Sequence, residues 1–228
     1  DPLDLKRKNL LRLGDTTATG QTLKESVGVQ ECVEKAFAAS GYAAKRARGP
    51  VVSGRTARGI GASVFLHGAG FTGSGEKYLK GKVAVDLLPG GRARVRTAST
   101  EMGQGVETVF RQIAADGLGV GVERVDFAVP STQVVPDSGP TVASRTVMIV
   151  GSILEKAARE LAGRVAALAA EKGLAPAAAW ELLAADPEKA TALVQYEPPP
   201  DVVWDDATYS GDAYPAYGWA CDVAEVEV

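Results

Sequence analysis

The stretch Ser99-Thr-Glu-Met-Gly-Gln-Gly-Val-Glu-Thr108 joins a predicted strand to a predicted helix. The strand covers residues 92–98, where small or apolar residues alternate with arginines, a pattern typical of a strand with one buried face. The helix runs from about Val106 to Gly117, because its apolar residues recur at i, i+3, i+4, i+7 and i+8. Together they predict mixed α and β structure around this turn.

Two glycines flank Gln104 within the turn. Glycine allows positive φ and the close approach of a ligand, and the helix start is expected to offer free N–H groups and a positive dipole end. Gln104 adds a donor and an acceptor, so the turn suits a polar, anionic ligand. The alternative is a turn that only connects the two elements. The sequence matches neither the Walker motif nor the dinucleotide-binding G-x-G-x-x-G motif.

The same order of strand, polar loop and helix occurs a second time. Residues 125–129 alternate as a strand, residues 130–144 form a long polar loop, and a helix is expected from about Thr146 to Glu171. The loop contains Pro136-Asp-Ser-Gly-Pro-Thr141. Two such loops from one sheet can converge on one ligand. Arg145, where the loop enters the helix, either pairs with an anion or is simply exposed.

The remaining elements favour the α+β class. Residues 1–50 are interpreted as an N-terminal helical segment whose last part, from residue 43, is a basic connection. A hairpin is expected to turn at Pro89-Gly-Gly91, and a last strand starts near residue 217. Because helices and strands mix without regular alternation, we expect residues 51–228 to form a truncated α+β domain, with a mixed sheet and helices on one face.

The bulk composition narrows the functional class. A net charge of −3 argues against nucleic-acid binding, and no apolar run approaches the roughly 20 residues of a membrane helix. Cys32 and Cys221 lie far apart in sequence, which indicates a reducing, cytoplasmic compartment, although a single bridge between them stays open. The chain starts without methionine and stops within a predicted strand, so we expect a piece of a longer polypeptide.

Several single residues have both a structural and a functional interpretation. His67, the only histidine, has no partner at metal-ligand spacing, so a structural role is favoured. Glu101 and Glu107 near the central turn are either solvated or cap the helix, where the dipole favours acidic groups. Phe71, in a glycine-rich loop, either lines a pocket or packs in a core.

Three motifs follow one another along the chain: Thr100-Glu-Met-Gly-Gln-Gly105, Gln112-Ile-Ala-Ala-Asp116 and Pro136-Asp-Ser-Gly-Pro-Thr-Val-Ala-Ser-Arg145. In residue identity, order and spacing they resemble motifs of the molybdopterin-binding subunit of the xanthine dehydrogenase/aldehyde oxidase family. Gly68-Ala-Gly-Phe71 resembles the substrate-pocket loop of that family, and Tyr217-Gly-Trp-Ala-Cys221 resembles one of its late strands. The resemblance spans essentially the whole chain and implies a fragment of such a subunit.

The resemblance implies a molybdenum hydroxylase. Enzymes of this family carry molybdenum on molybdopterin, in bacteria often in its cytosine dinucleotide form, and hydroxylate purines, N-heterocycles or aldehydes with oxygen from water. Electrons leave through iron–sulfur clusters to FAD on partner domains or subunits. Phe71 and Ala143 would contact the substrate. The positions that would bind the cofactor are Gly103, Gln104, Gly105, Thr141, Ala143, Ser144 and Thr146.

Departures from the family pattern limit these expectations. The catalytic glutamate of the family lies beyond the end of this sequence, so no catalytic residue is assigned and the chain alone is expected to be inactive. Val142 stands where many members carry alanine, which would narrow the pocket or alter substrate choice. One alternative is a non-catalytic scaffold that packs against other subunits, in which the loops of Gln104 and Ala143 need not face one site. Another, a phosphate- or nucleotide-binding module, lacks the lysine that such loops usually carry.

Overall fold

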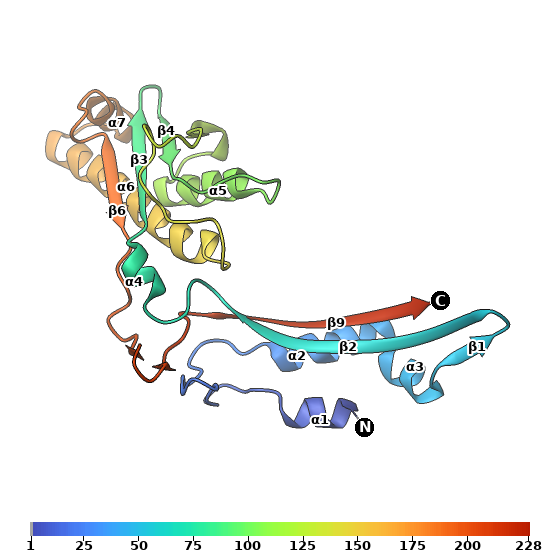
Figure 1. The fold of residues 1–228 in the computed structure, drawn as a ribbon. Coiled ribbons are helices and arrows are strands. Elements are labelled where there is room, and N and C mark those ends of the chain that lie inside the picture. Colours follow the sequence, from blue (N-terminus) through green and yellow to red (C-terminus); the bar gives the residue numbers. More distant parts are fainter. Residues whose placement is uncertain (1) are drawn as a thin grey trace. The chain divides into compact units, whose positions relative to one another are not determined.

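The computed structural model describes residues 2–228, which divide into two compact units. The first unit comprises Asp1–Gly68 and Val203–Val228, and the second comprises Ala69–Val202. Each unit has a sheet and helices of its own (Figure 1). All residues predicted to bind cofactor or substrate lie in the second unit.

A mixed sheet forms the centre of the second unit, with its strands in the order β5-β4-β3-β6. β3 pairs antiparallel with both β4 and β6, whereas β4 and β5 run parallel. The predicted hairpin at Pro89-Gly-Gly91 is confirmed, because it connects β3 to β4. The strands are β3 (Lys82–Leu88), β4 (Arg92–Arg96), β5 (Val125–Phe127) and β6 (Thr191–Gln195).

Helices cover one face of this sheet (Figure 1). In β4, Ala93 and Val95 are fully buried against the helices, whereas Arg92 and Arg94 are exposed. The predicted apolar faces of the two long helices are buried in the same core. The mixed sheet with helices on one face confirms the predicted fold class. The helices are α5 (Val106–Leu118), α6 (Gly151–Lys172), which continues a π-helical turn η2 (Thr146–Val150), and α7 (Pro176–Ala184).

An antiparallel sheet in the order β1-β2-β9 and three neighbouring helices form the first unit within the described residues. Helix α2 packs along β9 and buries Val33 and Phe37 together with Leu3 and Tyr42. Both cysteines are free, so the bridge that the sequence left open is not formed. The elements are α1 (Pro2–Lys8), α2 (Val29–Ser40), α3 (Tyr42–Arg48), β1 (Val51–Ser53), β2 (Thr56–Gly68), β7 (Trp204–Asp205), β8 (Ser210–Gly211) and β9 (Tyr217–Glu227).

The chain between α2 and β1 differs from the prediction. Residues 42–48 form α3 rather than a basic connection. Tyr42 is buried and stacks on Phe37 with 4.6 Å between ring centroids, which anchors the start of α3. One buried aromatic residue in a basic stretch leaves no helical apolar pattern, so the prediction was wrong here. The boundary expected near residue 50 falls inside the first unit, because β2 pairs with β9 along its length.

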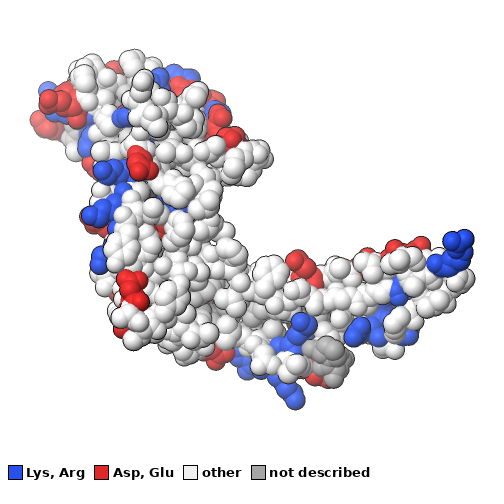
Figure 2. Space-filling model, viewed as in Figure 1, with Lys and Arg blue, Asp and Glu red and all other residues white. Residues whose placement is uncertain are grey.

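Charged side chains of both signs are spread over the visible surface (Figure 2). In the first unit, the ion pairs Lys45–Glu225 and Arg58–Glu227 connect α3 and β2 to β9. Within residues 2–228, none of the helices combines the length and the apolar composition that crossing a membrane requires.

Two helical glycines test the contact between α5 and α6. A Cβ atom on Gly117 would lie 2.7 Å from the Cβ atom of Ala158, whereas a Cβ atom on Gly163 would meet nothing within 4 Å. We expect Gly117→Ala to lower the free energy of unfolding by about 1–3 kcal/mol, because overpacking forces the helices apart. The control Gly163→Ala should raise it by about 0.5–1 kcal/mol through helix propensity. Urea unfolding measures both values, and a neutral Gly117→Ala would argue against the close contact.

Candidate functional site

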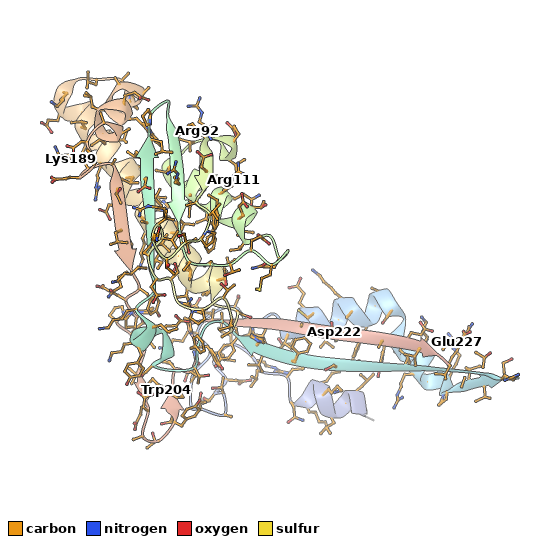
Figure 3. All side chains as sticks on the ribbon, turned by 45° about the horizontal axis from the view of Figure 1, so that its top comes forward. Arg92, Arg111, Lys189, Trp204, Asp222 and Glu227 are labelled. Atoms are coloured by element: carbon orange, nitrogen blue, oxygen red, sulfur yellow. The ribbon has the colours of Figure 1, made fainter. Side chains whose placement is uncertain are left out.

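Both predicted loops leave the sheet at the same edge. β4 and β5 are parallel neighbours, so their carboxyl ends lie side by side, and one predicted loop follows each strand. Arg111 of α5 donates to the carbonyl oxygen of Val125 at 2.7 Å, and Arg92 of β4 pairs with Asp126 of β5. Figure 3 labels the two arginines within this unit. These contacts hold α5, β4 and β5 together beneath the loops. Ligands of open α/β sheets commonly bind outside the carboxyl ends of the strands.

The first loop, residues 97–105, folds back on itself. Gly103 and Gly105 adopt φ values of 97° and 84°, the left-handed conformation expected of glycine here. Nε2 of Gln104 donates to the carbonyl oxygen of Thr100 at 2.7 Å, and its Oε1 accepts from the N–H of Met102 at 2.6 Å. Gln104 therefore holds the loop together while remaining exposed to solvent.

Glu101 occupies the N-terminal end of α5 with its carboxylate. Oε1 accepts from the N–H groups of Gly103 at 2.7 Å and Gly105 at 3.0 Å, and Oε2 accepts from the N–H of Glu107 at 3.1 Å. These hydrogen bonds, that of Glu107 first, hold the pKa of Glu101 below its ordinary value. The capping role of Glu101 is confirmed. The expectation of free N–H groups at this helix start is wrong, because an acidic side chain of the turn already fills the anion position.

Ser138 joins the second loop, residues 128–145, to the first. Its Oγ is buried, accepts from the N–H of Ala98 at 2.9 Å and lies 2.8 Å from Oγ1 of Thr97. The same Oγ is 2.7 Å from the carbonyl oxygen of Lys82, to which it donates. The N–H of Thr100 donates to Oγ1 of Thr141 at 2.9 Å, which makes a second link. The structure thus brings the two predicted loops into direct contact.

Ala143 and Ser144 have an uncommon backbone conformation. Their φ values are 55° and 51°, in the left-handed region that non-glycine residues seldom adopt. Among the described residues, no acceptor receives a hydrogen bond from either main-chain N–H. Thr146 then opens the π-helical turn η2, a feature that is frequent at functional sites. Strained backbone and available donors coincide at the predicted cofactor positions.

Arg145 is buried, with 1% of its surface exposed. Its guanidinium forms a bidentate pair with Glu76 of α4 (Gly75–Leu79), at distances of 2.8 to 3.1 Å. It also donates to the carbonyl oxygens of Ser138 at 2.7 Å and Pro140 at 3.1 Å. Of the two alternatives for Arg145, pairing with an anion is confirmed and exposure is wrong, and the anion is the Glu76 carboxylate of the chain itself. Removing one partner of such a buried pair typically costs about 3–5 kcal/mol.

Phe71 lies in a third loop, residues 69–74, which the same contacts connect to the other two. Its N–H donates to Oε1 of Glu76 at 3.2 Å, and the N–H of Gly70 donates to the carbonyl oxygen of Ala143 at 2.9 Å. The Phe71 side chain is half-buried and belongs to neither apolar core of the described residues. The loops that carry Phe71, Gln104 and Ala143 are therefore neighbours within one unit.

A family model for the molybdopterin cofactor-binding domain matches residues 35–228, which include all three loops. The chain belongs to the molybdopterin cofactor-binding domain family. The matched residues extend over both units, so the family assignment covers the elements that support the loops as well as the loops.

Similar proteins are named as xanthine dehydrogenases and aldehyde oxidoreductase. Xanthine dehydrogenase/oxidase of Rattus norvegicus is 26% identical over 230 residues, covering 98% of this chain and 17% of that protein. The xanthine dehydrogenase molybdenum-binding subunit of Escherichia coli O157:H7 is 30% identical over 172 residues, 75% of this chain and 22% of that subunit. The solved structure of aldehyde oxidoreductase from Desulfovibrio gigas covers 100% of this chain with 26% identity and a TM-score of 0.79, and uses 24% of that chain. The molybdopterin cofactor-binding domain described here thus spans between a sixth and a quarter of each of these three proteins.

The second unit of this molybdopterin cofactor-binding domain offers groups that fit a polar, anionic cofactor. The N–H groups of Ala143 and Ser144 are available as donors, and the Gln104 amide is exposed between two glycines. Within residues 2–228, no three His, Cys, Asp or Glu side chains gather into a metal site. A cofactor that brings its own metal ligands requires orienting donors and small side chains from the protein, and these are present.

Glu76 and Ser138 are the site residues that the sequence did not single out. Ser138 lies inside the quoted proline-rich motif, but nothing in the sequence marks it as buried. Glu76 lies 69 residues from Arg145, and no helix was predicted over α4, which carries it. Each has its role through a contact with a residue far away in the sequence, and local sequence patterns do not reveal such contacts.

A hollow of about 530 Å³ lies at the other end of the sheet from the loops of the molybdopterin cofactor-binding domain. Gly90 and Gly91 of the β3–β4 turn line it, together with apolar residues such as Leu118, Val165 and Trp180. The turn stands at the opposite end of β4 from Ala98, so this hollow is separate from the loops that carry the family motifs.

The Glu101 carboxylate leads to a prediction on pH dependence. Because its pKa is lowered in the folded chain, its hydrogen bonds stabilise the turn above the ordinary glutamate pKa of about 4.3, and this stabilisation is lost as the pH falls through the lowered value. In Glu101→Gln, we expect the amide hydrogens of Gly103, Gly105 and Glu107 to exchange about tenfold faster at pH 7, since charge-assisted hydrogen bonds are replaced by neutral ones. Hydrogen exchange followed by NMR measures this.

The matched control is Glu107→Gln, because the Glu107 carboxylate is exposed and accepts none of these three hydrogen bonds. Exchange at the three amides should stay within about twofold of the wild type in this control. An equal acceleration in both variants would contradict the role of Glu101.

Proposed function

We propose that this chain is the part of a larger molybdenum hydroxylase that binds molybdopterin. The observation that carries the proposal is the contact between the two motif-bearing loops. Ser138 and the Thr100–Thr141 hydrogen bond hold them together beyond the carboxyl ends of β4 and β5. Family membership supports a cofactor of this class at that position.

In this proposal each loop has its own task. Gln104 orients the cofactor with its amide, while Gly103 and Gly105 allow close approach. The N–H groups of Ala143 and Ser144 donate to anionic oxygens of the cofactor, and Thr141 and Thr146 flank them. The small side chain of Ala143 leaves room for the substrate, and Phe71 forms a wall for a planar one. When bound, the cofactor supplies the redox chemistry and delivers oxygen derived from water.

The proposal extends to the complete cytoplasmic enzyme. Its substrate would be a purine, another N-heterocycle or an aldehyde, a range that matches the names xanthine dehydrogenase and aldehyde oxidoreductase among similar proteins. The cofactor would be molybdopterin or its cytosine dinucleotide form. Iron–sulfur clusters and FAD on partner domains or subunits would accept the electrons, and the rest of the molybdenum subunit would complete the pocket.

The scaffold alternative makes a different demand on the geometry. A segment that only packs against other subunits has no need for its two motif-bearing loops to meet. The hydrogen bond between Thr100 and Thr141 therefore favours the cofactor proposal over the scaffold. The side chain of Gln104 makes hydrogen bonds within its own loop and remains exposed to solvent, so it is not buried by packing.

The role of Gln104 can be tested in the complete enzyme. We expect Gln104→Ala to reduce the molybdenum content, or the turnover per molybdenum, by about tenfold or more, because one orienting side chain is lost. Metal analysis by mass spectrometry and steady-state kinetics measure the two quantities. Gln133→Ala is the control, since Gln133 is exposed in the same unit and its side chain makes no hydrogen bond among the described residues. Wild-type metal content and rate in Gln104→Ala would contradict the assignment.

The chain on its own is expected to be inactive. It contains no residue assigned as the catalytic base and would retain little cofactor without the rest of the subunit. Purification of the 228-residue chain, followed by metal analysis and an oxidation assay with xanthine, nicotinate and benzaldehyde, tests this expectation. Steady turnover of any of these by the isolated chain would show that the site is complete within it.

A further inference from the structure

The buried pair of Arg145 and Glu76 is connected to the loops of Phe71 and Ala143, the two residues that the proposed function places against the substrate. Glu76 and Arg145 are 3% and 1% exposed, respectively. Oε1 of Glu76 accepts from both Nε of Arg145 at 2.9 Å and the N–H of Phe71 at 3.2 Å. One carboxylate oxygen thus connects the guanidinium to the main chain of Phe71.

The other side of the guanidinium determines the path of the second loop. Nη1 donates to the carbonyl oxygens of Ser138 and Pro140, at 2.7 and 3.1 Å. Arg145 also directly follows Ser144, the second of the two left-handed residues. The N–H of Gly70 donates to the carbonyl oxygen of Ala143, so the loops of Phe71 and Ala143 are tied by a direct bond as well as through the pair.

Three glycines lie next to the pair, and a side chain at any of these positions would come close to it. A Cβ atom on Gly81 would lie 3.1 Å from Nη2 of Arg145, and one on Gly139 would lie 3.1 Å from Nη1. A Cβ atom on Gly70 would come within 3.4 Å of Oε1 of Glu76. Only a planar fork of donors satisfies Glu76 and the two carbonyl groups at once, which explains arginine rather than lysine at position 145.

We infer that Glu76 and Arg145 are positioning residues that set the separation between Phe71 and Ala143, and with it the width of substrate that the site accepts. The inference rests on the proposed function for the identity of these two contacts. Neither residue touches the substrate. Both act through the main chain of the two loops, because the other side-chain hydrogen bonds described for them end on backbone groups of those loops.

The first test is physical and uses hydrogen exchange on the complete protein. Glu76→Gln keeps the shape of the side chain but presents an amide N–H₂ to the guanidinium, so the bidentate pair is lost. We expect exchange of the hydrogen-bonded amides in residues 69–76 and 137–145, such as those of Phe71 and Arg145, to rise by about tenfold. The amides in residues 98–105 that Glu101 and Gln104 hold should keep their protection. Arg145→Lys, which keeps the charge and loses the fork, should act in the same direction.

Glu181→Gln is the matched control. Its carboxylate also accepts from main-chain N–H groups, those of Gly90 and Gly91, but at the far end of the sheet. This variant should leave exchange in residues 69–76 and 137–145 unchanged. Unchanged exchange in Glu76→Gln, or acceleration that extends equally to residues 98–105, would overturn the inference.

The second test asks whether Glu76 acts through Phe71. The complete enzyme is assayed with whichever of xanthine, nicotinate and benzaldehyde it oxidises fastest. We expect Glu76→Gln to raise KM by about tenfold with kcat within about twofold, and to add less than about twofold in KM when Phe71→Ala is already present. If Glu76 contributed only to stability, Glu76→Gln would lower kcat and metal content instead. Its effect would then multiply with that of Phe71→Ala in the double variant.

The outcomes separate this inference from the proposed function. Independent, multiplicative effects of Glu76→Gln and Phe71→Ala on KM would overturn the positioning role while leaving cofactor binding intact. A wild-type enzyme without molybdenum that oxidises none of the three compounds would contradict the proposed function. In that case, the hydrogen-exchange result still decides whether the pair holds the two loops.

Discussion

A buried guanidinium must be paired, and this requirement organises the functional end of the second unit. Arg145 satisfies it with Glu76 and with the carbonyl groups of Ser138 and Pro140. An unpaired charge in the same place would be strongly unfavourable, so the two segments that supply its partners, α4 and the second loop, are held in one arrangement. Ser138 extends this arrangement to the loop after β4, again through buried hydrogen bonds. Polar contacts, rather than apolar packing, therefore determine how the loops of the molybdopterin cofactor-binding domain lie.

These contacts also explain how the chain maintains unfavourable backbone conformations. Left-handed Ala143 and Ser144 and the π-helical turn that follows are individually costly. They persist because Arg145, directly after them, is anchored on both sides. The main-chain donors at 143 and 144 are consequently held in place before any ligand arrives, and a site prepared in this way loses little conformational entropy on binding. The left-handed backbone of Ala143 and Ser144 thus depends on the buried hydrogen bonds of Arg145.

Local patterns predicted the elements whose residues repeat at a fixed period. The hairpin at 89–91, the alternating strand before the central turn and the two long helices were found because apolar spacing and turn residues are visible in sequence. Helix α3 depends on one stacking contact of Tyr42, and the apolar residues of the short β6 and α4 show no clear period. None of these three elements was therefore predicted. The motif loops were found through their turn chemistry and their family resemblance. Glu76 escaped because its partner lies 69 residues away.

Under the proposed function, the two kinds of donor in these loops should contribute unequally to cofactor affinity. The Gln104 amide already bonds to Thr100 and Met102, so any bond to a ligand replaces an existing one and adds only the difference between them. The N–H groups of Ala143 and Ser144 bond to no described protein acceptor, so a ligand oxygen there replaces only water. Gln104 is accordingly better suited to orient the cofactor, and the strained main chain of the second loop to hold it.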